Sequence, residues 1–126
     1  MKFLHSMIRV KDENEAIKFY CDFLGLKKAE RIRLDDCYLQ YLTDTNTNMQ
    51  IELTINDSIP ENGYKTGSAF GHFAFECEDL DKITEKIKQF GYSWELEPVY
   101  IKEINTRISF INDPDGNSIE LIEKKN

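Results

Sequence analysis

The chain has 126 residues, enough for one domain whose hydrophobic core needs no disulfide for stability. Its 16 Lys and Arg against 23 Asp and Glu leave a net charge of -7, which disfavours nucleic acid or an anionic membrane as a partner. The remaining partner classes are a small molecule and another protein. Odd in number and widely spaced, Cys21, Cys37 and Cys77 predict reduced, packed thiols in a cytoplasmic protein. The first ten residues do not match a signal peptide, and no apolar run approaches membrane-spanning length.

The amino-terminal third predicts a strand followed by a helix. Residues 3–10 alternate between two faces as a strand does, and His5 and Arg9 fall on the same face. The run that begins at Asp12 matches a capping box. Apolar residues at helical spacing follow it, and Gly25 provides the stop signal, so we expect a helix of about three turns.

The next segment predicts consecutive strands separated by polar turns. In the third of them, Ile51, Leu53 and Ile55 form an apolar face, which places Glu52 and Asn56 together on the opposite face. The strands are expected near 27–34, 37–43 and 48–55.

After an aperiodic stretch at 57–67, which we interpret as a connecting loop, the pattern starts again. A strand runs through His72, which faces away from the phenylalanines beside it. A helix follows, capped by Asp79 or Asp81 and ended by Gly91. The last strands are expected near 93–99, 104–112 and 117–123.

The chain therefore predicts an α+β fold with two copies of strand, helix, strand, strand, strand. Glu52 lies 47 residues after His5, and Glu120 lies 48 residues after His72. In both copies a histidine belongs to the first strand and a glutamate to the fourth. We expect a single domain made of a first module, a linker and a second module, with approximate bounds 1–56, 57–67 and 68–126.

Two imidazoles and two carboxylates presented from strands are a suitable ligand set for a divalent transition metal. Nickel, cobalt, zinc, manganese and iron all accept such ligands, and open positions on the metal would suit Lewis-acid chemistry on adjacent oxygens. The alternative is that the histidines and glutamates occupy their strands by chance. The duplicated spacing makes chance a poorer explanation than it would be for one pair.

The chain resembles, nearly end to end, the vicinal oxygen chelate superfamily, and within it the glyoxalase I (lactoylglutathione lyase) family of the short bacterial type. The resemblance implies that the two modules form a curved mixed-sheet cleft and that two chains pair as a homodimer. It also implies that each metal takes His5 and Glu52 from one subunit and His72 and Glu120 from the other. The segments that carry it are LHSMIRV at 4–10, IKFYCDFLGL at 17–26, IELTIN at 51–56, GSAFGHFAF at 67–75 and NDPDGNSIEL at 112–121.

The family's substrate is the hemithioacetal of methylglyoxal and glutathione, and its product is S-lactoylglutathione. By position, the resemblance makes Glu120 the principal base and Glu52 its partner for the returning proton. The short form of the chain resembles nickel-dependent relatives, so Ni²⁺ is expected, with Zn²⁺ or Co²⁺ as alternatives.

The resemblance also implies substrate contacts. Arg9 and Asn56 match positions that contact glutathione, and each lies four strand residues beyond a metal ligand. Around the second module the match is weaker. Ser68 stands where many relatives have arginine, and the substrate loop expected over 97–107 is long and poor in glycine. Lys102 is assigned to glutathione binding within that loop.

Other functions of the same fold stay open at this stage. One group comprises further metalloenzymes of the superfamily: an epimerase, a dioxygenase or a thiol transferase. The other is a non-catalytic protein that binds a small drug molecule without metal, as bleomycin-resistance relatives do. Relatives with three metal ligands lack a counterpart of Glu52, so its presence favours the lyase.

Overall fold

The structure, a computed structural model, describes residues 1–125. They form two compact units, Met1–Lys65 and a second that begins at Thr66, and each unit combines a mixed four-stranded sheet with one main helical segment. The predicted α+β class and its repeated order of elements are confirmed. No helix in the described part of the chain is long and apolar enough to cross a membrane. The organisation as a single domain with a linker at 57–67 stays a prediction.

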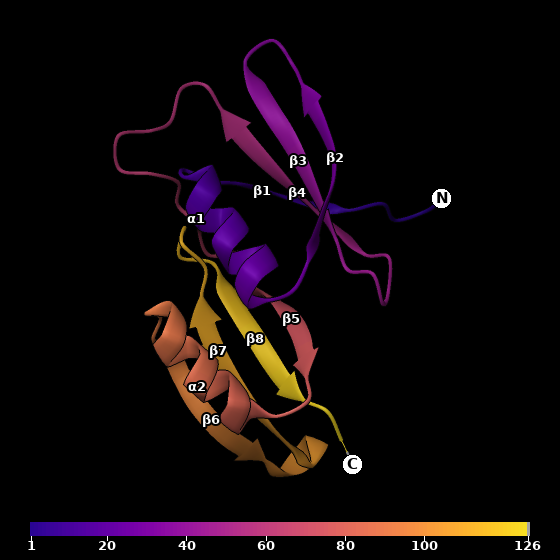
Figure 1. The fold of residues 1–126 in the computed structure, drawn as a ribbon, viewed down its shortest axis with the longest axis vertical. Helices are drawn as coiled ribbons and strands as arrows, with labels where there is room; N and C mark the ends of the chain where they lie inside the picture. Colours follow the sequence, from indigo (N-terminus) through magenta and orange to yellow (C-terminus); the bar gives the residue numbers. More distant parts are fainter. Residues whose placement is uncertain (126) are drawn as a thin grey trace. The chain divides into compact units, whose positions relative to one another are not determined.

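In the first unit the helical segment lies over one face of the sheet (Figure 1). The strand order is β1-β4-β3-β2, in which β1 runs parallel to β4 and the other pairs are antiparallel. The elements are β1 (Ser6–Arg9), α1 (Glu13–Ile17), the π-helical segment η1 (Lys18–Phe23), β2 (Lys27–Arg33), β3 (Cys37–Thr43) and β4 (Gln50–Asn56).

The first helix begins and ends where the sequence predicts, but it changes type midway. The Asp12 carboxylate accepts a hydrogen bond of 3.0 Å from the backbone N–H of Glu15, as a capping residue should. From Lys18 the helix widens, and the N–H of Leu24 donates to the carbonyl of Phe19, five residues back. Gly25 then adopts a φ of 89°, a conformation that favours glycine. The expected regular helix is therefore α-helical only in its first part.

Strand β1 is shorter than the predicted strand at 3–10. Its pairing with β4 starts at Ser6, opposite Ile51, close to the residue where β4 itself begins. Phe3 and Leu4 lie before this pairing and are 76% and 67% exposed. His5 consequently precedes the strand by one residue instead of lying within it.

The second unit repeats the arrangement, with strand order β5-β8-β7-β6 and the β5–β8 pair parallel. Its helix is capped by Asp79, whose carboxylate accepts from the N–H groups of Asp81 and Lys82, and it ends at Gly91 with a φ of 74°. The elements are β5 (His72–Cys77), α2 (Leu80–Phe90), β6 (Trp94–Ile101), the 3-10 turn η2 (Lys102–Ile104), β7 (Thr106–Asn112) and β8 (Ser118–Glu123).

The substrate loop expected over 97–107 is not a loop. Strand β6 continues to Ile101, η2 makes the turn, and β7 starts at Thr106. Register shifts within the β6–β7 pair bend this hairpin. Asn105 closes the turn in the left-handed conformation with a φ of 52°. The segment lacks glycine because the hairpin needs only this one residue at positive φ, and asparagine tolerates it.

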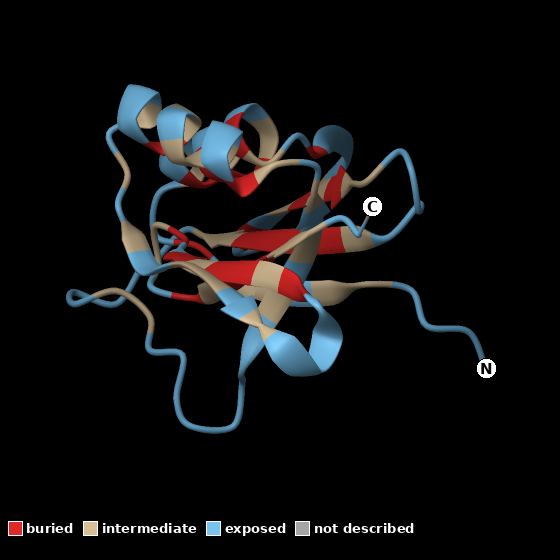
Figure 2. Cartoon of the chain, turned by 90° about the horizontal axis from the view of Figure 1, so that it is seen from below, coloured by how far each residue is buried: buried red, intermediate tan, exposed pale blue. Residues whose placement is uncertain are grey.

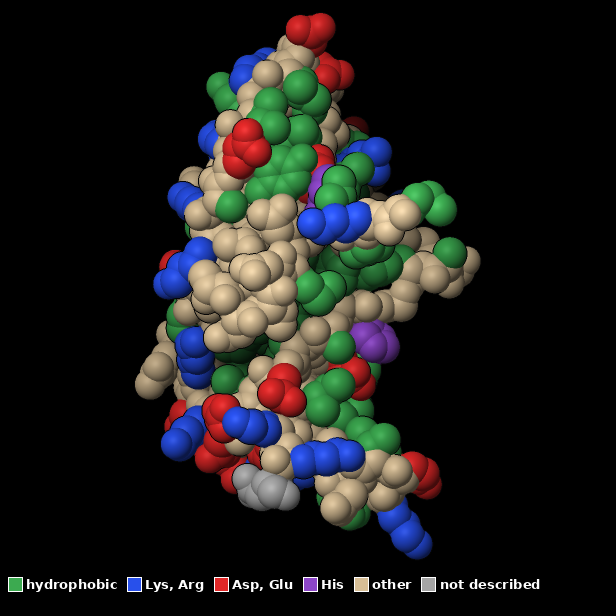
Figure 3. Space-filling model, turned by 90° about the vertical axis from the view of Figure 1, so that its right-hand side faces the viewer, with side chains coloured by type: hydrophobic (Ala, Val, Ile, Leu, Met, Phe, Trp, Pro, Cys, Tyr) green, Lys and Arg blue, Asp and Glu red, His purple; other side chains and the backbone are tan. Residues whose placement is uncertain are grey.

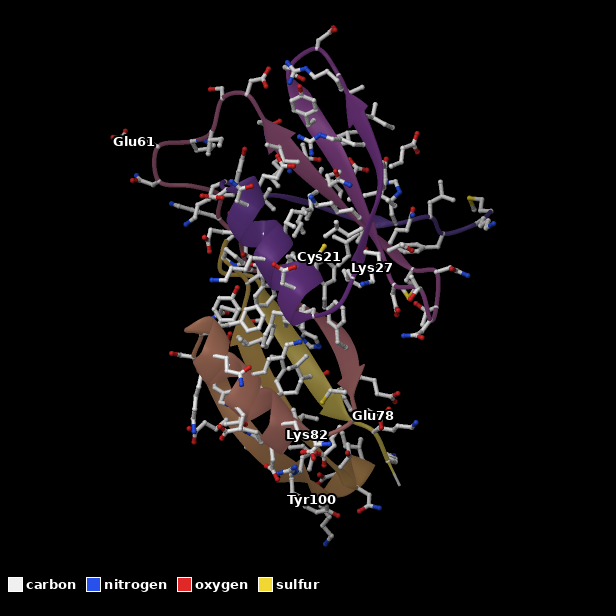
Figure 4. All side chains as sticks on the ribbon, viewed as in Figure 1. Cys21, Lys27, Glu61, Glu78, Lys82 and Tyr100 are labelled. Atoms are coloured by element: carbon white, nitrogen blue, oxygen red, sulfur yellow. The ribbon has the colours of Figure 1, made fainter. Side chains whose placement is uncertain are left out.

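Buried residues lie on the strands and on the sides of the helices that face them, whereas the outer sides of the helices are exposed (Figure 2). Fully buried residues include Tyr20, Leu42, Leu53, Leu80, Ile111 and Ile119. All three cysteines are free, as predicted, and Cys21 lies on η1 (Figure 4). Burial raises the pKa of the Cys77 thiol to about 11, so this thiol stays protonated at neutral pH.

An ion-pair network ties the start of α2 to its sheet. Arg107 donates to both carboxylate oxygens of Glu123, at 3.1 and 2.7 Å, and to Asp81 at 3.0 Å. Glu123 also accepts from the backbone N–H of Leu80, the first residue of α2. Hydrogen bonds from Arg107, followed by the one from Leu80, lower the pKa of the Glu123 carboxyl.

We expect Glu123→Gln to reduce the free energy of unfolding by about 1–3 kcal/mol near pH 7, because it removes a charge-assisted pair that is only 21% exposed at the carboxylate. The folded pKa of Glu123 lies below its unfolded value. Its stabilisation is therefore present above the unfolded pKa and is lost as pH falls through the folded pKa.

Urea unfolding of wild type and variant from about pH 7 to about pH 3 should show their difference shrinking in acid. The control is Glu78→Gln, since Glu78 projects from the β5–α2 connection (Figure 4) and its side chain is 82% exposed. A difference that stays constant with pH would contradict this role for Glu123.

Candidate metal centre

In the first unit, His5 and Glu52 come together as predicted. Nε2 of His5 lies 2.7 Å from Oε2 of Glu52, and the two side chains are 28% and 11% exposed. Glu52 is held in place by β4, where Leu53 and Ile51 on the opposite face are buried in the core. The alternation of β4 therefore turns the glutamate away from the helix, as the sequence predicts.

In the second unit, His72 and Glu120 form the corresponding pair. Nε2 of His72 lies 3.5 Å from Oε1 of Glu120, and the side chains are 41% and 18% exposed. Ile119 and Leu121 anchor the strand from the opposite face at 0% and 2% exposure. Both histidine side chains are partly exposed to solvent, and Figure 3 shows histidine in purple at the surface.

Strand register makes the two pairs equivalent. Glu52 lies opposite Met7, two residues after His5. Glu120 lies opposite Ala74, which is likewise two residues after His72. The spacing found in the sequence thus becomes the same juxtaposition across a parallel strand pair in each unit, and each unit offers one imidazole nitrogen and one carboxylate oxygen to a common point.

The surroundings of Glu52 contain two hydroxyl groups. The Tyr41 hydroxyl donates to Oε2 at 3.1 Å, and the Thr54 hydroxyl donates to Oε1 at 3.3 Å. Burial, followed by the hydrogen bond to Glu52, raises the pKa of Tyr41, so its hydroxyl remains a protonated donor at neutral pH. The Tyr41 ring also meets the ring of His5 edge-on, with centroids 5.3 Å apart.

The donor set fits a divalent transition metal. Imidazole nitrogen and carboxylate oxygen suit nickel, cobalt or zinc, whereas the cysteines take no part in either pair. Within either unit, as far as residues 1–125 show, no third His, Cys, Asp or Glu joins the pair. Each unit thus offers two candidate metal ligands.

Comparison with known proteins identifies the family. The family model described as "Glyoxalase/Bleomycin resistance protein/Dioxygenase superfamily" matches residues 2–121. The chain belongs to this superfamily. A lactoylglutathione lyase of Escherichia coli O157:H7 is 35% identical over 99% of the chain and 94% of its own length. A lactoylglutathione lyase of Arabidopsis thaliana is 32% identical over 98% of the chain, but the chain spans only 44% of that relative.

Solved structures agree with this assignment to the glyoxalase superfamily. The crystal structure of a V278E glyoxalase I mutant from Zea mays has a TM-score of 0.87 and 34% sequence identity, and it covers 99% of this chain. The chain covers 45% of that maize chain. The two-module glyoxalase fold is therefore confirmed for this chain.

The other predicted site residues have different surroundings. Arg9 is exposed on β1 opposite Thr54, on the face that carries Glu52. Asn56 ends β4, and its amide nitrogen donates to the Tyr64 hydroxyl at 2.9 Å. Lys102 is the first residue of η2, in the turn that precedes β7. Glu120 lies opposite Phe110, a later residue of β7. The structure brings Arg9 to the face of the first pair, but no contact joins Lys102 to the second pair within residues 1–125.

Two residues beside Glu52 had no predicted role: Thr54, which alternation places on the same face, and Tyr41, for which the sequence does contain a signal. The polar turn after Thr43 joins two antiparallel strands, and pairing Thr43 with Gln50 places Tyr41 opposite Glu52. Counting inward from a predicted hairpin turn would have found it. Thr54 shares the face of Glu52, but alternation alone does not show that its hydroxyl turns toward the carboxylate.

Proposed function

We propose that this chain is a metal-dependent lactoylglutathione lyase that isomerises the hemithioacetal of methylglyoxal and glutathione to S-lactoylglutathione, which removes methylglyoxal. The duplicated histidine–glutamate pair carries the proposal, since it places the same two ligand types at equivalent positions in both units. Relatives with the name lactoylglutathione lyase, matched over nearly their whole length, support it.

His5, Glu52, His72 and Glu120 would hold the metal, with Ni²⁺ the expected ion and Zn²⁺ or Co²⁺ the alternatives. A bound divalent metal supplies Lewis acidity that makes the substrate's C–H proton more acidic. The ligand types are compatible with all three ions, so affinity order alone does not select one.

Two carboxylates divide the proton transfer in this proposal. Glu120 takes the proton from the hemithioacetal carbon that bears sulfur. The electron pair of the broken C–H bond forms a double bond to the neighbouring carbonyl carbon, and the π pair of that carbonyl moves onto its oxygen. A proton is then returned to that neighbouring carbon, with Glu52 as the partner carboxylate. Atoms and charge balance, because the C–H proton moves from the sulfur-bearing carbon to its neighbour and the hydroxyl proton moves from the oxygen on the first carbon to the oxygen on the second. The hemithioacetal thereby becomes a hydroxy thioester.

Three side chains outside the metal-ligand set are the proposed glutathione contacts. The Arg9 guanidinium would contact a glutathione carboxylate, because it is exposed on the same face as Glu52. The side-chain carbonyl of Asn56 would accept from a substrate amide while its nitrogen donates to Tyr64. Lys102, at the β6–β7 turn, is a further proposed contact.

We further propose that modules 1–56 and 68–126, joined by 57–67, act as one domain in a homodimer whose sites are shared between subunits. Each unit would supply two of the four proposed ligands, a histidine and a glutamate that lie together, so a complete site would need a first and a second unit. Symmetric pairing of two chains provides two such combinations.

The decisive test measures thioester formation from methylglyoxal pre-equilibrated with glutathione. Protein stripped of metal is reloaded separately with nickel, cobalt or zinc, and metal content is measured on the same samples. We expect activity with at least one metal and none in the stripped protein. Metal salts without protein serve as the background control.

If no thioester forms with any metal although metal binds stoichiometrically, this substrate is ruled out. The other metalloenzyme reactions of the superfamily then remain as candidates. Failure to bind any metal would favour a metal-free binding protein. Replacing glutathione with other thiols in the same assay shows whether glutathione is the cosubstrate.

We expect Arg9→Ala to raise the KM for the glutathione adduct about tenfold while kcat changes little, because a charge-assisted contact to a remote part of the substrate binds ground state and transition state alike. Steady-state kinetics at saturating metal measure both constants. Lys28→Ala is the control, since it removes a positive charge from β2 at a position opposite Leu42, on the other face of the sheet. An unchanged KM would show that Arg9 is only a surface charge and does not contact the substrate.

A further inference from the structure

The two histidine–glutamate pairs differ in one aromatic residue. Tyr41 lies opposite Glu52 in the β3–β4 pair, and Phe110 lies opposite Glu120 in the β7–β8 pair. Each ring meets its histidine edge-on, with centroids 5.3 Å apart and interplanar angles of 79° and 83°. The two positions are thus equivalent in register and packing, and they differ by a hydroxyl group.

A second hydroxyl is also confined to the first unit. Thr54, two residues after Glu52, donates to its Oε1 at 3.3 Å, whereas the residue two positions after Glu120 is Ile122, which has no side-chain donor. Both carboxylate oxygens of Glu52 therefore have hydroxyl partners. Within residues 1–125, the polar contact of the Glu120 carboxylate is His72 Nε2 at 3.5 Å.

The different contacts restrict the movement of the Glu52 carboxylate more than that of the Glu120 carboxylate. A carboxylate held on both oxygens must break two hydrogen bonds before its side chain can rotate, and Glu52 is also the more buried of the two, at 11% against 18% side-chain exposure. The principal base must move toward the substrate's C–H bond to take the proton, whereas a carboxylate that binds the metal and returns a proton from a fixed position benefits from being held.

We propose that Tyr41 and Thr54 are positioning residues that hold Glu52 as the stationary carboxylate, and that Phe110 leaves Glu120 free to act as the mobile base. This inference rests on the proposed lyase function and deepens it. It explains, from residues outside the ligand set, how two glutamates in equivalent positions take different roles.

The test compares Tyr41→Phe with the reciprocal variant Phe110→Tyr in the full-length protein. Affinity for Co²⁺ is measured by chelator competition, the cobalt absorption spectrum is recorded, and kcat is measured at saturating cobalt. Tyr41→Phe should raise the Co²⁺ Kd about tenfold and change the spectrum, with a much smaller effect on kcat. Phe110→Tyr should leave the Kd unchanged or lower, and should lower kcat about tenfold by tethering Glu120.

Tyr38→Phe is the matched control. Tyr38 lies on the same strand but on the other face, where Arg31 and Arg33 stack on its ring, so the same loss of a hydroxyl should leave the Co²⁺ Kd and kcat as in wild type. Thr54→Val should weaken Co²⁺ binding in the same direction as Tyr41→Phe. Thr54→Ser should recover most of that affinity because it keeps the hydroxyl. These variants keep the test decisive if Tyr41→Phe folds poorly.

Two results would overturn the inference: an unchanged Co²⁺ Kd in both Tyr41→Phe and Thr54→Val, or a Phe110→Tyr variant with wild-type kcat. Metal binding without hemithioacetal turnover in the wild type would refute the proposed function, and the Kd comparison would still decide whether Tyr41 and Thr54 position Glu52. A wild-type protein that binds no Co²⁺, Ni²⁺ or Zn²⁺ would overturn both.

Discussion

Glu120→Gln should lower kcat about a hundredfold to ten-thousandfold while the protein stays folded and retains most of its metal affinity. Glutamine has nearly the same shape as glutamate, so Ile119 and Leu121 should still hold the strand in place. Its amide oxygen can still face His72, but the side chain cannot accept a proton at neutral pH. Loss of the general base alone accounts for a reduction of this size.

The measurement pairs kcat at saturating metal with metal content and unfolding midpoint on the same preparation. Glu76→Gln is the matched control, since Glu76 lies on β5 on the face of His72 and is exposed. It should retain wild-type turnover. A Glu120→Gln variant with more than about a tenth of wild-type kcat would exclude Glu120 as the principal base.

Much of the fold was predictable because its signals are local. Asp12 and Asp79 cap their helices through contacts within three residues, and Gly25 and Gly91 end them at positive φ. The π-helical segment was not predictable, because over six residues the burial of Phe19, Tyr20 and Phe23 suits a wide turn as well as a regular one. The short β1 follows from where its partner strand begins, which is not a local property.

The candidate site was predictable from sequence patterns as two separate histidine–glutamate pairs, and those patterns do not show how the pairs combine. Alternation placed each histidine and glutamate on a sheet face, and the repeat in spacing linked His5 with Glu52 and His72 with Glu120. The contact of Tyr41 with Glu52 depends on the register between β3 and β4, which the alternation within one strand does not reveal. The misassigned loop at 97–107 had no strong turn signal, because its left-handed residue is an asparagine instead of a glycine.

Mixing two inactive variants tests how the two histidine–glutamate pairs combine into the proposed metal site. Neither His5→Ala nor Glu120→Ala alone should be active, since each lacks one ligand in every site. If sites are shared between subunits, subunit exchange between the two variants should restore about a quarter of wild-type activity. Half of the dimers formed by random pairing are mixed, and one of the two sites in each mixed dimer receives both intact units.

The alternative arrangement gives no recovery, because a site built within one chain carries a defect whichever subunit accompanies it. Native mass spectrometry of the mixture must first establish that mixed dimers have formed. A mixture of His5→Ala with Glu52→Ala is the matched control, since both changes fall in the first unit and every shared site then remains defective. Recovery in the first mixture but not in this control would assign each metal to the first unit of one chain and the second unit of another. Recovery in neither, despite demonstrated mixed dimers, would refute the sharing of sites between subunits.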